Sequence, residues 1–329
     1  MRIWRSTLCV AVVAILAGCQ PAEQEAVAAT PEPANTGTGW HCPAEPGTAP
    51  TGVLTAQRIA ITEAGDDLPR LYEGPVWHDG SLYYSDFLLS EGFRSRIQRF
   101  TPPDRLETAI INSGSNGLAL DEQGRIVAAT HDRKELARYD VSERSRERII
   151  GQYQGNPFSS PNDLVIARDG SIYFTDPDFQ RSASVGGQDK TRVYRYARGE
   201  VTVVDDSIAN PNGIALSPAG DVLYVAGGGN DGVLRAYPLV EGKPQAGKDL
   251  AKVAVPDGMA VDCLGNLYVT EHSLRRVRVL SPAGAELARI DVDANITNAA
   301  FGGADMKTLY LTGAGVVWSL DLDVAGLPY

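Results

Sequence analysis

Short runs of alternating apolar and polar residues, broken by glycine turns, return along most of this chain. One example is "SSPNDLVIARDGSIYFTDP" at residues 159–177, where one strand-like run precedes an Asp-Gly turn and a second follows it. Such runs are rich in β-branched and aromatic residues, and helix signals are nearly absent, which is typical of antiparallel β structure. The pattern therefore predicts an all-β protein.

The turn and the strand after it occur in six copies. Aligning these strands places six residues in one column, at intervals of 42 to 51 residues: Tyr83, Val127, Tyr173, Tyr224, Tyr268 and Tyr310. A period of about 40–45 residues with four short strands per copy is typical of a β-propeller. We therefore predict six blades of four antiparallel strands around a central channel.

An additional alternating run, Val53–Thr62, precedes the first copy. We expect it to supply the outer strand of the last blade, because this pairing would close the ring and remove an open sheet edge. The propeller is thus predicted to extend over residues 53–329.

The first 18 residues have the features of an export signal. Arg2 and Arg5 precede an apolar run, Leu8–Ala17, that is too short to span a bilayer. This segment is expected to be removed, and it contributes nothing to the predicted fold.

The segment "LAGC" at Leu16–Cys19 resembles the lipobox of bacterial lipoproteins. The resemblance implies cleavage before Cys19 and a lipid on its sulfur, whereas the alternative is a plain signal peptide that is cut elsewhere. Gln20 follows in place of Asp, which favours the outer membrane, with the protein facing the periplasm. Residues 19–52 begin rich in Pro, Ala, Thr and Glu and would serve as a flexible tether.

Cys42 and Cys263 are the two cysteines that remain after the signal segment and the predicted lipidation site. In an exported protein they can form a disulfide, and two buried thiols are the alternative. Neither belongs to a CxxC motif, and the chain has no HxxxH motif, so these cysteines do not indicate a metal site.

The chain has a net charge of −11, which becomes −13 when Arg2 and Arg5 leave with the signal. No basic stripe is present to neutralise phosphates, which argues against nucleic acid as a partner. The acidic balance is compatible with divalent cations.

Each copy carries an oxygen-bearing residue at the start of the strand before its turn: Glu73, Asn116, Asn162, Asn212, Asp257 and Asn298. This strand is the innermost one in a propeller, so the six side chains are expected at one mouth of the channel. Amide and carboxylate oxygens without Cys or His suit Ca²⁺ or Mg²⁺ better than Zn²⁺. For any single Asn-Gly or Asp-Gly step, turn formation is the competing interpretation.

The second strand of each blade returns to the same mouth. His131 and His272 end two of these strands and are candidates for proton transfer or substrate contact, with a surface loop position as the alternative. Asp176 ends a third strand, where it can contact substrate or only order the loop before Pro177.

The segments "YEGPVW", "SPNDLVIARDGSIYFTDP", "PNGIALSP", "PDGMAVD" and "TNAAFGG" resemble the gluconolactonase, regucalcin and luciferin-regenerating-enzyme-like family, over about residues 70–315. Diisopropyl fluorophosphatase is a more distant relative. The resemblance implies a six-bladed propeller with one divalent cation in its channel. Ca²⁺ is the preferred ion, and Mg²⁺, Mn²⁺ or Zn²⁺ are alternatives.

The resemblance also implies roles for individual residues. Glu73, Asn162 and Asn212 match metal ligands, and Asp257 matches a carboxylate that binds metal and acts as base or nucleophile. Asn116 falls near a substrate-contacting Asn.

We therefore expect a metal-dependent lactonase that opens a sugar lactone or similar cyclic ester. Asp257, or His131 through a water, would accept the proton. Substrate contacts are predicted at Asn116, Asp176, His272 and Asn298. The alternatives are a phosphotriesterase-like or arylesterase hydrolase on the same metal site, and a non-enzymatic propeller that binds a ligand. Any membrane contact would be through the lipid anchor, and the sequence carries no signal for an oligomeric state.

Overall fold

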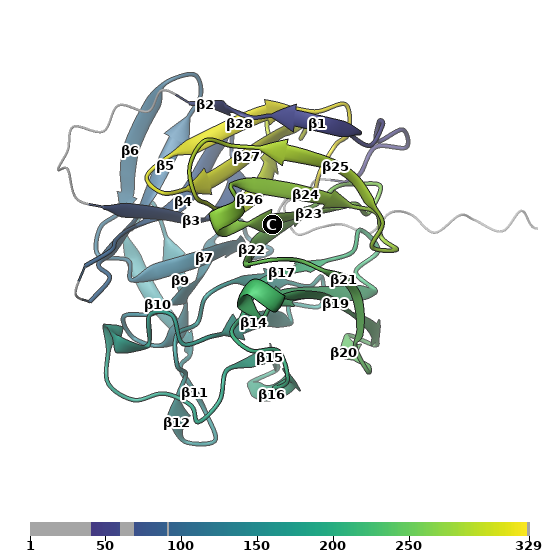
Figure 1. The fold of residues 1–329 in the computed structure, drawn as a ribbon. Helices are drawn as coiled ribbons and strands as arrows, with labels where there is room; N and C mark the ends of the chain where they lie inside the picture. The colour runs from purple at the N-terminus through teal and green to yellow at the C-terminus, as the bar shows by residue number, and fades with distance from the viewer. Residues whose placement is uncertain (1–40, 60–68, 91, 328–329) are drawn as a thin grey trace, which may run out of the picture. The chain divides into compact units, whose positions relative to one another are not determined.

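The computed structural model describes residues 41–59, 69–90 and 92–327. Strands make up its regular structure, apart from three short 3₁₀ helices: η1 (Arg181–Ala183), η2 (Gly229–Asp231) and η3 (His272–Leu274). Six sheets stand around a centre (Figure 1), which confirms the predicted six-bladed propeller. Within the described ranges, none of the helices has the length and apolar character needed to cross a bilayer. The predicted signal segment and Cys19 lie outside these ranges.

Blades 1 to 3 are antiparallel sheets that follow one another along the chain. Blade 1 contains β3 (Arg70–His78), β4 (Ser81–Leu88), β5 (Ser95–Thr101) and β6 (Arg105–Ile110). Blade 2 contains β7 (Ser115–Leu120), β8 (Ile126–Thr130), β9 (Glu135–Asp140) and β10 (Ser145–Ile150). Blade 3 contains β13 (Leu164–Ile166), β14 (Ile172–Asp176), β15 (Arg192–Ala197) and β16 (Glu200–Asp205). A small hairpin between blades 2 and 3 consists of β11 (Gln152–Tyr153) and β12 (Asn156–Pro157).

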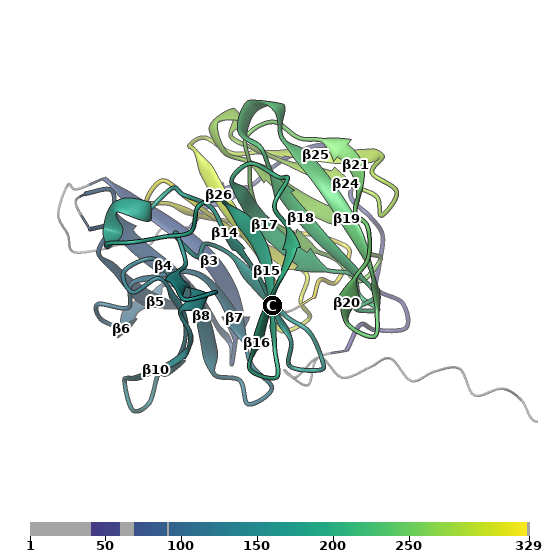
Figure 2. The ribbon, with the colours of Figure 1, turned by 90° about the horizontal axis from the view of Figure 1, so that it is seen from below.

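Blades 4 to 6 complete the ring, and the labelled strands of blade 4 are seen from below in Figure 2. Blade 4 contains β17 (Pro211–Leu216), β18 (Val222–Gly227), β19 (Val233–Val240) and β21 (Lys248–Lys252), with β20 (Lys243–Pro244) on the far end of β19. Blade 5 contains β22 (Pro256–Val261), β23 (Leu267–Glu271), β24 (Arg276–Leu280) and β25 (Glu286–Asp291). Blade 6 contains β26 (Ile296–Gly302), β27 (Thr308–Gly313) and β28 (Val317–Asp321).

The two strands that precede blade 1 in the chain join two different blades. β2 (Gln57–Arg58) pairs with β28 and becomes the outer strand of blade 6, as predicted for this part of the run. β1 (Gly52–Thr55) instead adds to blade 5, in parallel with β25, which the sequence pattern did not predict. The buried Ala56 lies at the crossing point, where its N–H donates to the carbonyl of Asp291 at 3.2 Å. Residues 60–62 of the predicted strand lie outside the described ranges.

The hydrophobic core lies between neighbouring blades rather than in the channel. The six residues that align the sequence copies are all buried, none more than 5% exposed. Tyr83 of blade 1, for example, packs in one cluster with Leu118 and Tyr139 of blade 2. Because each blade buries its faces against its neighbours, the inner strand ends are left to carry polar groups.

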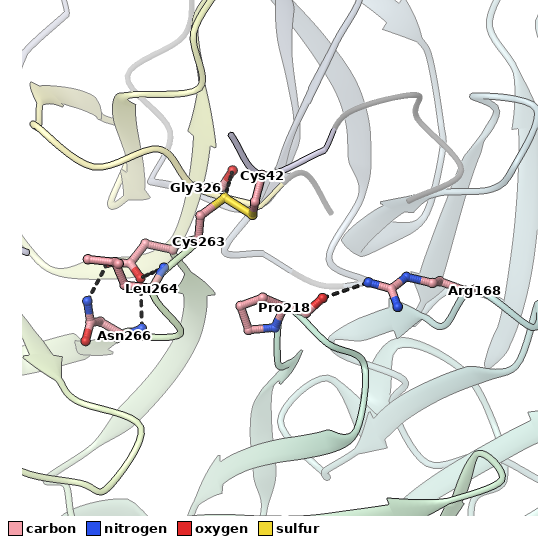
Figure 3. Close-up of a disulfide and its surroundings, with 8 residues drawn as sticks. Cys42, Arg168, Pro218, Cys263, Leu264, Asn266 and Gly326 are labelled. Atoms are coloured by element: carbon pink, nitrogen blue, oxygen red, sulfur yellow. Dashed lines mark hydrogen bonds between the residues drawn. A yellow bond between two sulfur atoms is a disulfide. The ribbon is translucent and has the colours of Figure 1, made fainter. Parts of the chain in front are cut away.

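A disulfide fastens the beginning of the described chain to the propeller. Cys42 is bonded to Cys263, 221 residues away, with 5.6 Å between their Cα atoms (Figure 3). The N–H of Ala325 donates to the carbonyl of Pro46, and the N–H of Cys263 donates to the carbonyl of Ala325, both at 2.8 Å. These residues before position 52, which the sequence analysis assigns to the tether, therefore contact the propeller.

Candidate functional site

In five of the six innermost strands the pairing is irregular at the predicted site residue or directly beside it, as at a β-bulge. The pairing register shifts between residues 73 and 76 in β3, 115 and 118 in β7, 211 and 214 in β17, 256 and 259 in β22, and 296 and 298 in β26. A bulge releases a residue from the regular alternation of a strand and re-aims its side chain. Each strand can therefore present an oxygen at the mouth while its remaining residues pack between blades.

Glycines beside the site residues allow neighbouring inner strands to approach closely. A Cβ on Gly117 would lie 2.5 Å from the carbonyl oxygen of Asn162, and the Gly117 N–H donates to that same oxygen at 2.7 Å. A Cβ on Gly258 would overlap the side chain of Asn298. Both glycines lie within strands. The Asn-Gly and Asp-Gly steps at these two positions are thus explained by close packing between blades rather than by turns.

Three carboxylates are buried together at the mouth: Glu73, Asp163 and Asp257. Burial holds the pKa of Glu73 well above its usual range, and the charges of Asp257 and Asp163 raise it further. Burial also raises the pKa of Asp163 to about 7. The three acids therefore repel one another when they are ionised.

Amide side chains hold two of these acids. Asn212 donates through Nδ2 to Oδ1 of Asp257 at 2.8 Å, and Asn298 donates through Nδ2 to Oδ2 of Asp163 at 3.3 Å. The buried Oδ1 of Asn116 has no hydrogen-bond partner in the described part of the chain. This residue is not among those that line the cavity described below, so its unpaired oxygen lies within the protein.

His272 is the histidine that the structure brings to Asp257. Its Nδ1 and Oδ2 of Asp257 are 3.0 Å apart, and Nδ2 of Asn295 lies 3.4 Å from its Nε2. The hydrogen bond with Asp257 raises the pKa of His272 above its ordinary value, although partial burial acts in the opposite direction. The side chain is 31% exposed, so solvent and ligands can reach this pair.

A cavity of about 290 Å³ opens at this mouth. Its walls include Glu73, Asn162, Asn212, Asp257 and His272, together with Phe179 and Gln180. None of the described residues that line it is Lys or Arg, so His272 is the one lining side chain that can offset the charge of its acids. A buried acidic pocket of this kind favours a positively charged ligand.

A larger, mainly apolar cavity of about 430 Å³ lies elsewhere, among residues such as Val165, Leu216 and Pro218. Arg168, which also lines it, donates to the carbonyl oxygen of Pro218 (Figure 3) and to that of Ala219. This cavity contains none of the predicted site residues, so the smaller polar cavity is the candidate functional site.

The structure does not bring His131 into this site. The residue is fully buried, its ring packs edge-on against Phe87 and Phe93, and its Nε2 lies 2.6 Å from the carbonyl oxygen of Phe93. Burial lowers its pKa, which favours the neutral ring. A proton-transfer role through water does not fit this enclosed position.

Replacement of His131 by glutamine is expected to leave kcat/KM for any hydrolytic reaction within about threefold of wild type, because His131 does not line the cavity and its ring contacts Phe87 and Phe93, which do not line it either. Glutamine can still donate to the carbonyl of Phe93 but loses the contacts with the two phenylalanine rings, so the melting temperature should fall. Steady-state kinetics and thermal unfolding of the same preparation check this. A loss of kcat above tenfold in a folded protein would restore His131 to the mechanism.

Asp176 is also enclosed and does not reach the cavity. It is 0% exposed, and its carboxylate accepts the N–H groups of Ser159 and Ser160 at 2.9 and 2.6 Å. The prediction that Asp176 contacts substrate directly is therefore wrong. The alternative that it orders a loop fits, although the loop is the one before β13 rather than the one that follows Asp176.

Two site residues were missed in the sequence. Asp163 follows Asn162 where four of the other five copies have glycine, and this exchange was the available signal for a third acid at the mouth. Gln180 lies in the connection between β14 and β15, which has no counterpart in the repeat, and it accepts hydrogen bonds from Ser160 at 3.2 Å and Asn116 at 3.5 Å.

The chain is similar in sequence and in structure to several known proteins. The chain is 31% identical to a 6-deoxy-6-sulfogluconolactonase of Pseudomonas putida, over 74% of this chain and 82% of that protein. It is 25% identical to a gluconolactonase of Zymomonas mobilis, over 70% of this chain and 72% of that protein. The solved structure of a gluconolactonase from Xanthomonas campestris is similar with a TM-score of 0.70 and 28% identity, covering 84% of this chain and 99% of that one. Residues 71–315 match the model of the SMP-30/gluconolactonase/LRE-like region, and the chain belongs to this family.

Proposed function

We propose that this protein is a divalent-metal-dependent lactonase that opens a sugar lactone or a similar cyclic ester. The observation that carries the proposal is the Asp257–His272 pair, hydrogen-bonded at 3.0 Å inside a cavity that also contains the buried Glu73. Relatives that share about a quarter to a third of its residues are named as lactonases of gluconate-type sugars. The pair and the relatives point to the same reaction class.

A divalent cation fits the donors at the mouth. Within the described ranges, no three His, Cys, Asp or Glu side chains group closely enough to hold a metal alone. The proposed set instead combines the carboxylates of Glu73 and Asp257 with the amide oxygens of Asn162 and Asn212, all of which line the cavity. Two carboxylates balance the charge of one divalent ion, and hard oxygen donors favour Ca²⁺. When bound, the cation would polarise the carbonyl of the lactone and stabilise the negative charge that develops on its oxygen.

The chain's own residues supply the proton transfer. Asn212 and His272 fix the two oxygens of Asp257, and each oxygen keeps a second lone pair for a water in the cavity. As the water oxygen bonds to the carbonyl carbon, Asp257 accepts its proton, with His272 orienting the carboxylate. The ring C–O bond then breaks, and the same proton passes to the ring oxygen, which leaves a hydroxy acid.

The remaining polar groups are suited to a polyhydroxylated substrate. Gln180 and Asn210 line the cavity and offer amide groups to the hydroxyls of a substrate. Asn116 and Asn298 are buried and are not among the described residues that line the cavity, so the predicted substrate contact at these two residues is not supported. Asn116 instead donates through Nδ2 to Oε1 of Gln180 at 3.5 Å. Phe179 lines the cavity, and its side chain is 48% exposed, so its ring can cover the apolar face of a sugar.

A substrate panel tests the proposal. Purified residues 20–329 are assayed with the δ- and γ-lactones of gluconate, with p-nitrophenyl acetate and with paraoxon, each in EDTA and in excess Ca²⁺. The proposal expects metal-dependent turnover of a lactone with kcat/KM at least about 100-fold above that for the other two classes. Preference for the aryl ester or the phosphotriester would favour the corresponding alternative hydrolase. A folded protein that turns over none of them would favour a ligand-binding propeller.

We also propose that the protein is exported and anchored by a lipid on Cys19, a residue outside the described ranges. The Cys42–Cys263 disulfide supports export, since structural disulfides are typical of oxidising compartments. Cell fractionation of the full chain is expected to find the protein with membranes, and the Cys19→Ser variant in the soluble fraction. An unchanged membrane association of this variant would contradict the lipid anchor.

A further inference from the structure

Two loops form the wall of the cavity beside blade 3. Residues 158–163 carry Asn162, and residues 177–188 carry Gln180. Neither loop contains a strand, so its geometry is fixed only if its backbone groups are bonded to the rest of the molecule. Two buried charged side chains, which the proposed mechanism does not use, supply such bonds.

Asp176 is the first of these charges and lies at the end of β14. Both of its oxygens are engaged by successive peptide groups, Ser159 N–H at Oδ2 and Ser160 N–H at Oδ1. Burial raises the pKa of Asp176 to about 7, while the two N–H groups and the charge of Lys134 act to lower it. Burial of this carboxylate costs desolvation free energy, and the carboxylate does not reach the cavity. Its burial is explained if its role is to hold the two peptide N–H groups that it binds.

Lys134 is the second charge, and it comes from blade 2. The side chain is 1% exposed, and its Nζ donates to the carbonyl oxygen of Ser159 at 2.6 Å and to that of Arg181 at 2.9 Å. One ammonium group therefore binds both loops of the wall. Its two acceptors are backbone carbonyls, so the contact fixes main-chain positions, while its charge also favours the ionised form of Asp176.

The contacts continue from these anchors to the cavity. Ser160 accepts the Gln180 N–H at 3.0 Å and donates to Gln180 Oε1 at 3.2 Å, so the two loops are also joined directly. Asn162 follows Ser160 by two residues, and its carbonyl is held by Gly117 of blade 2. A shift of the Ser159 peptide would therefore move both an amide proposed to bind the cation and an amide that lines the cavity.

We propose that Lys134 and Asp176 are positioning residues of the site, which hold Ser159 by its carbonyl and its N–H and thereby place Asn162 and Gln180. The inference deepens the proposed function and rests on it for the roles of those two amides. Because both side chains act on the same peptide segment, their effects should be strongly non-additive.

A matched control exists at the other end of the propeller. Asp262 is also fully buried and also accepts two backbone N–H groups, those of Leu264 and Asn266, at 2.9 and 2.8 Å. It follows β22 at the end opposite to Asp257. Replacement of Asp262 by asparagine thus reproduces the loss of a buried carboxylate without touching the cavity wall.

The experiment compares Lys134→Met, Asp176→Asn, their double variant and Asp262→Asn. Kinetics with the lactone found for wild type are measured at saturating Ca²⁺, Ca²⁺ affinity is measured by calorimetry, and hydrogen exchange is followed in peptides covering residues 156–164 and 178–188. Each of the first two variants is expected to lose about 100-fold in kcat/KM, the scale of a misplacement near 1 Å. The kcat/KM of the double variant should be no more than about threefold below that of the less active single variant. Asp262→Asn should keep kcat/KM within about threefold of wild type, although its melting temperature should fall by about as much as in the charge variants.

Retention of wild-type kcat/KM and Ca²⁺ affinity by Lys134→Met and Asp176→Asn would overturn the inference, as would losses equal to those of Asp262→Asn. If wild type hydrolyses no lactone, the proposed function fails, and faster exchange in both loops with weaker Ca²⁺ binding would still support the positioning role. If Lys134→Met and Asp176→Asn do not fold, Ser160→Ala provides a milder test, because it removes only the hydroxyl that joins the two loops. It is expected to raise KM at least about fivefold, and an unchanged KM would contradict the inference.

Discussion

Asp257→Asn is expected to lower kcat for lactone hydrolysis by about 10³-fold or more, because a positioned general base contributes 10²–10⁴-fold. Asparagine has nearly the same shape, but it cannot accept the proton and can offer only one acceptor oxygen to Asn212 and His272. Stopped-flow or pH-indicator kinetics with the best lactone of the panel measures the effect.

Asp262→Asn provides the control for this variant, since it alters the opposite end of the same inner strand. It should retain activity and lose stability, whereas Asp257→Asn should lose activity and retain its circular dichroism spectrum. An Asp257→Asn protein that turns over at the wild-type rate would remove this residue from the mechanism.

Glu73→Gln is expected to abolish metal-dependent turnover while making the metal-free protein more stable. Glu73 is fully enclosed beside Asp257 and Asp163, so its ionisation in the folded state is opposed by burial and by both charges. Glutamine removes that cost and keeps an oxygen for the N–H of Gly74, which now donates to Glu73 at 3.2 Å. In EDTA at pH 8 we expect a melting temperature at least about 3 °C above wild type, or roughly 1 kcal/mol.

The pH dependence gives this prediction a definite sign. The folded pKa of Glu73 is raised above its unfolded value, so the folded state binds more protons and wild-type stability falls as pH rises through that range. The advantage of Glu73→Gln in EDTA should therefore be large at pH 8 and vanish near pH 4. With saturating Ca²⁺ the order should reverse, because only the wild type retains both carboxylates for the ion. The melting temperatures of wild type and Glu73→Gln at pH 4 and pH 8 test this prediction. If Glu73→Gln were less stable than wild type in EDTA at pH 8, repulsion among the three carboxylates would be contradicted.

The six blades could be predicted because each copy carries the same alternation, turn and buried aromatic position. The oxygen at the front of each copy was visible for the same reason, and the structure places these residues at or beside the bulges of the inner strands or, for Asn162, just before β13. A repeated pattern reports what every blade must do to pack against its neighbours. It therefore predicts the framework and the general position of the mouth.

What the repeat cannot predict is the set of loops that cover the mouth. His131 and His272 both follow the second strand of a blade, but Phe87 and Phe93 of the neighbouring blade enclose His131, while His272 remains open to the cavity. Asp176 likewise points away from the cavity because its carboxylate accepts the N–H groups of Ser159 and Ser160, and its own position in the repeat does not reveal this. These contacts join residues whose spacing differs from blade to blade, so no periodic signal marks them.

The most direct test of the metal-dependent mechanism is lactone turnover measured against the number of Ca²⁺ ions bound per chain. Wild-type protein is stripped with EDTA, the chelator is removed, and Ca²⁺ is added stepwise while binding and rate are recorded on the same samples. The account predicts negligible turnover without metal and a rate that rises in proportion to bound ion up to one per chain. Full turnover in the stripped protein, unchanged as Ca²⁺ binds, would contradict it.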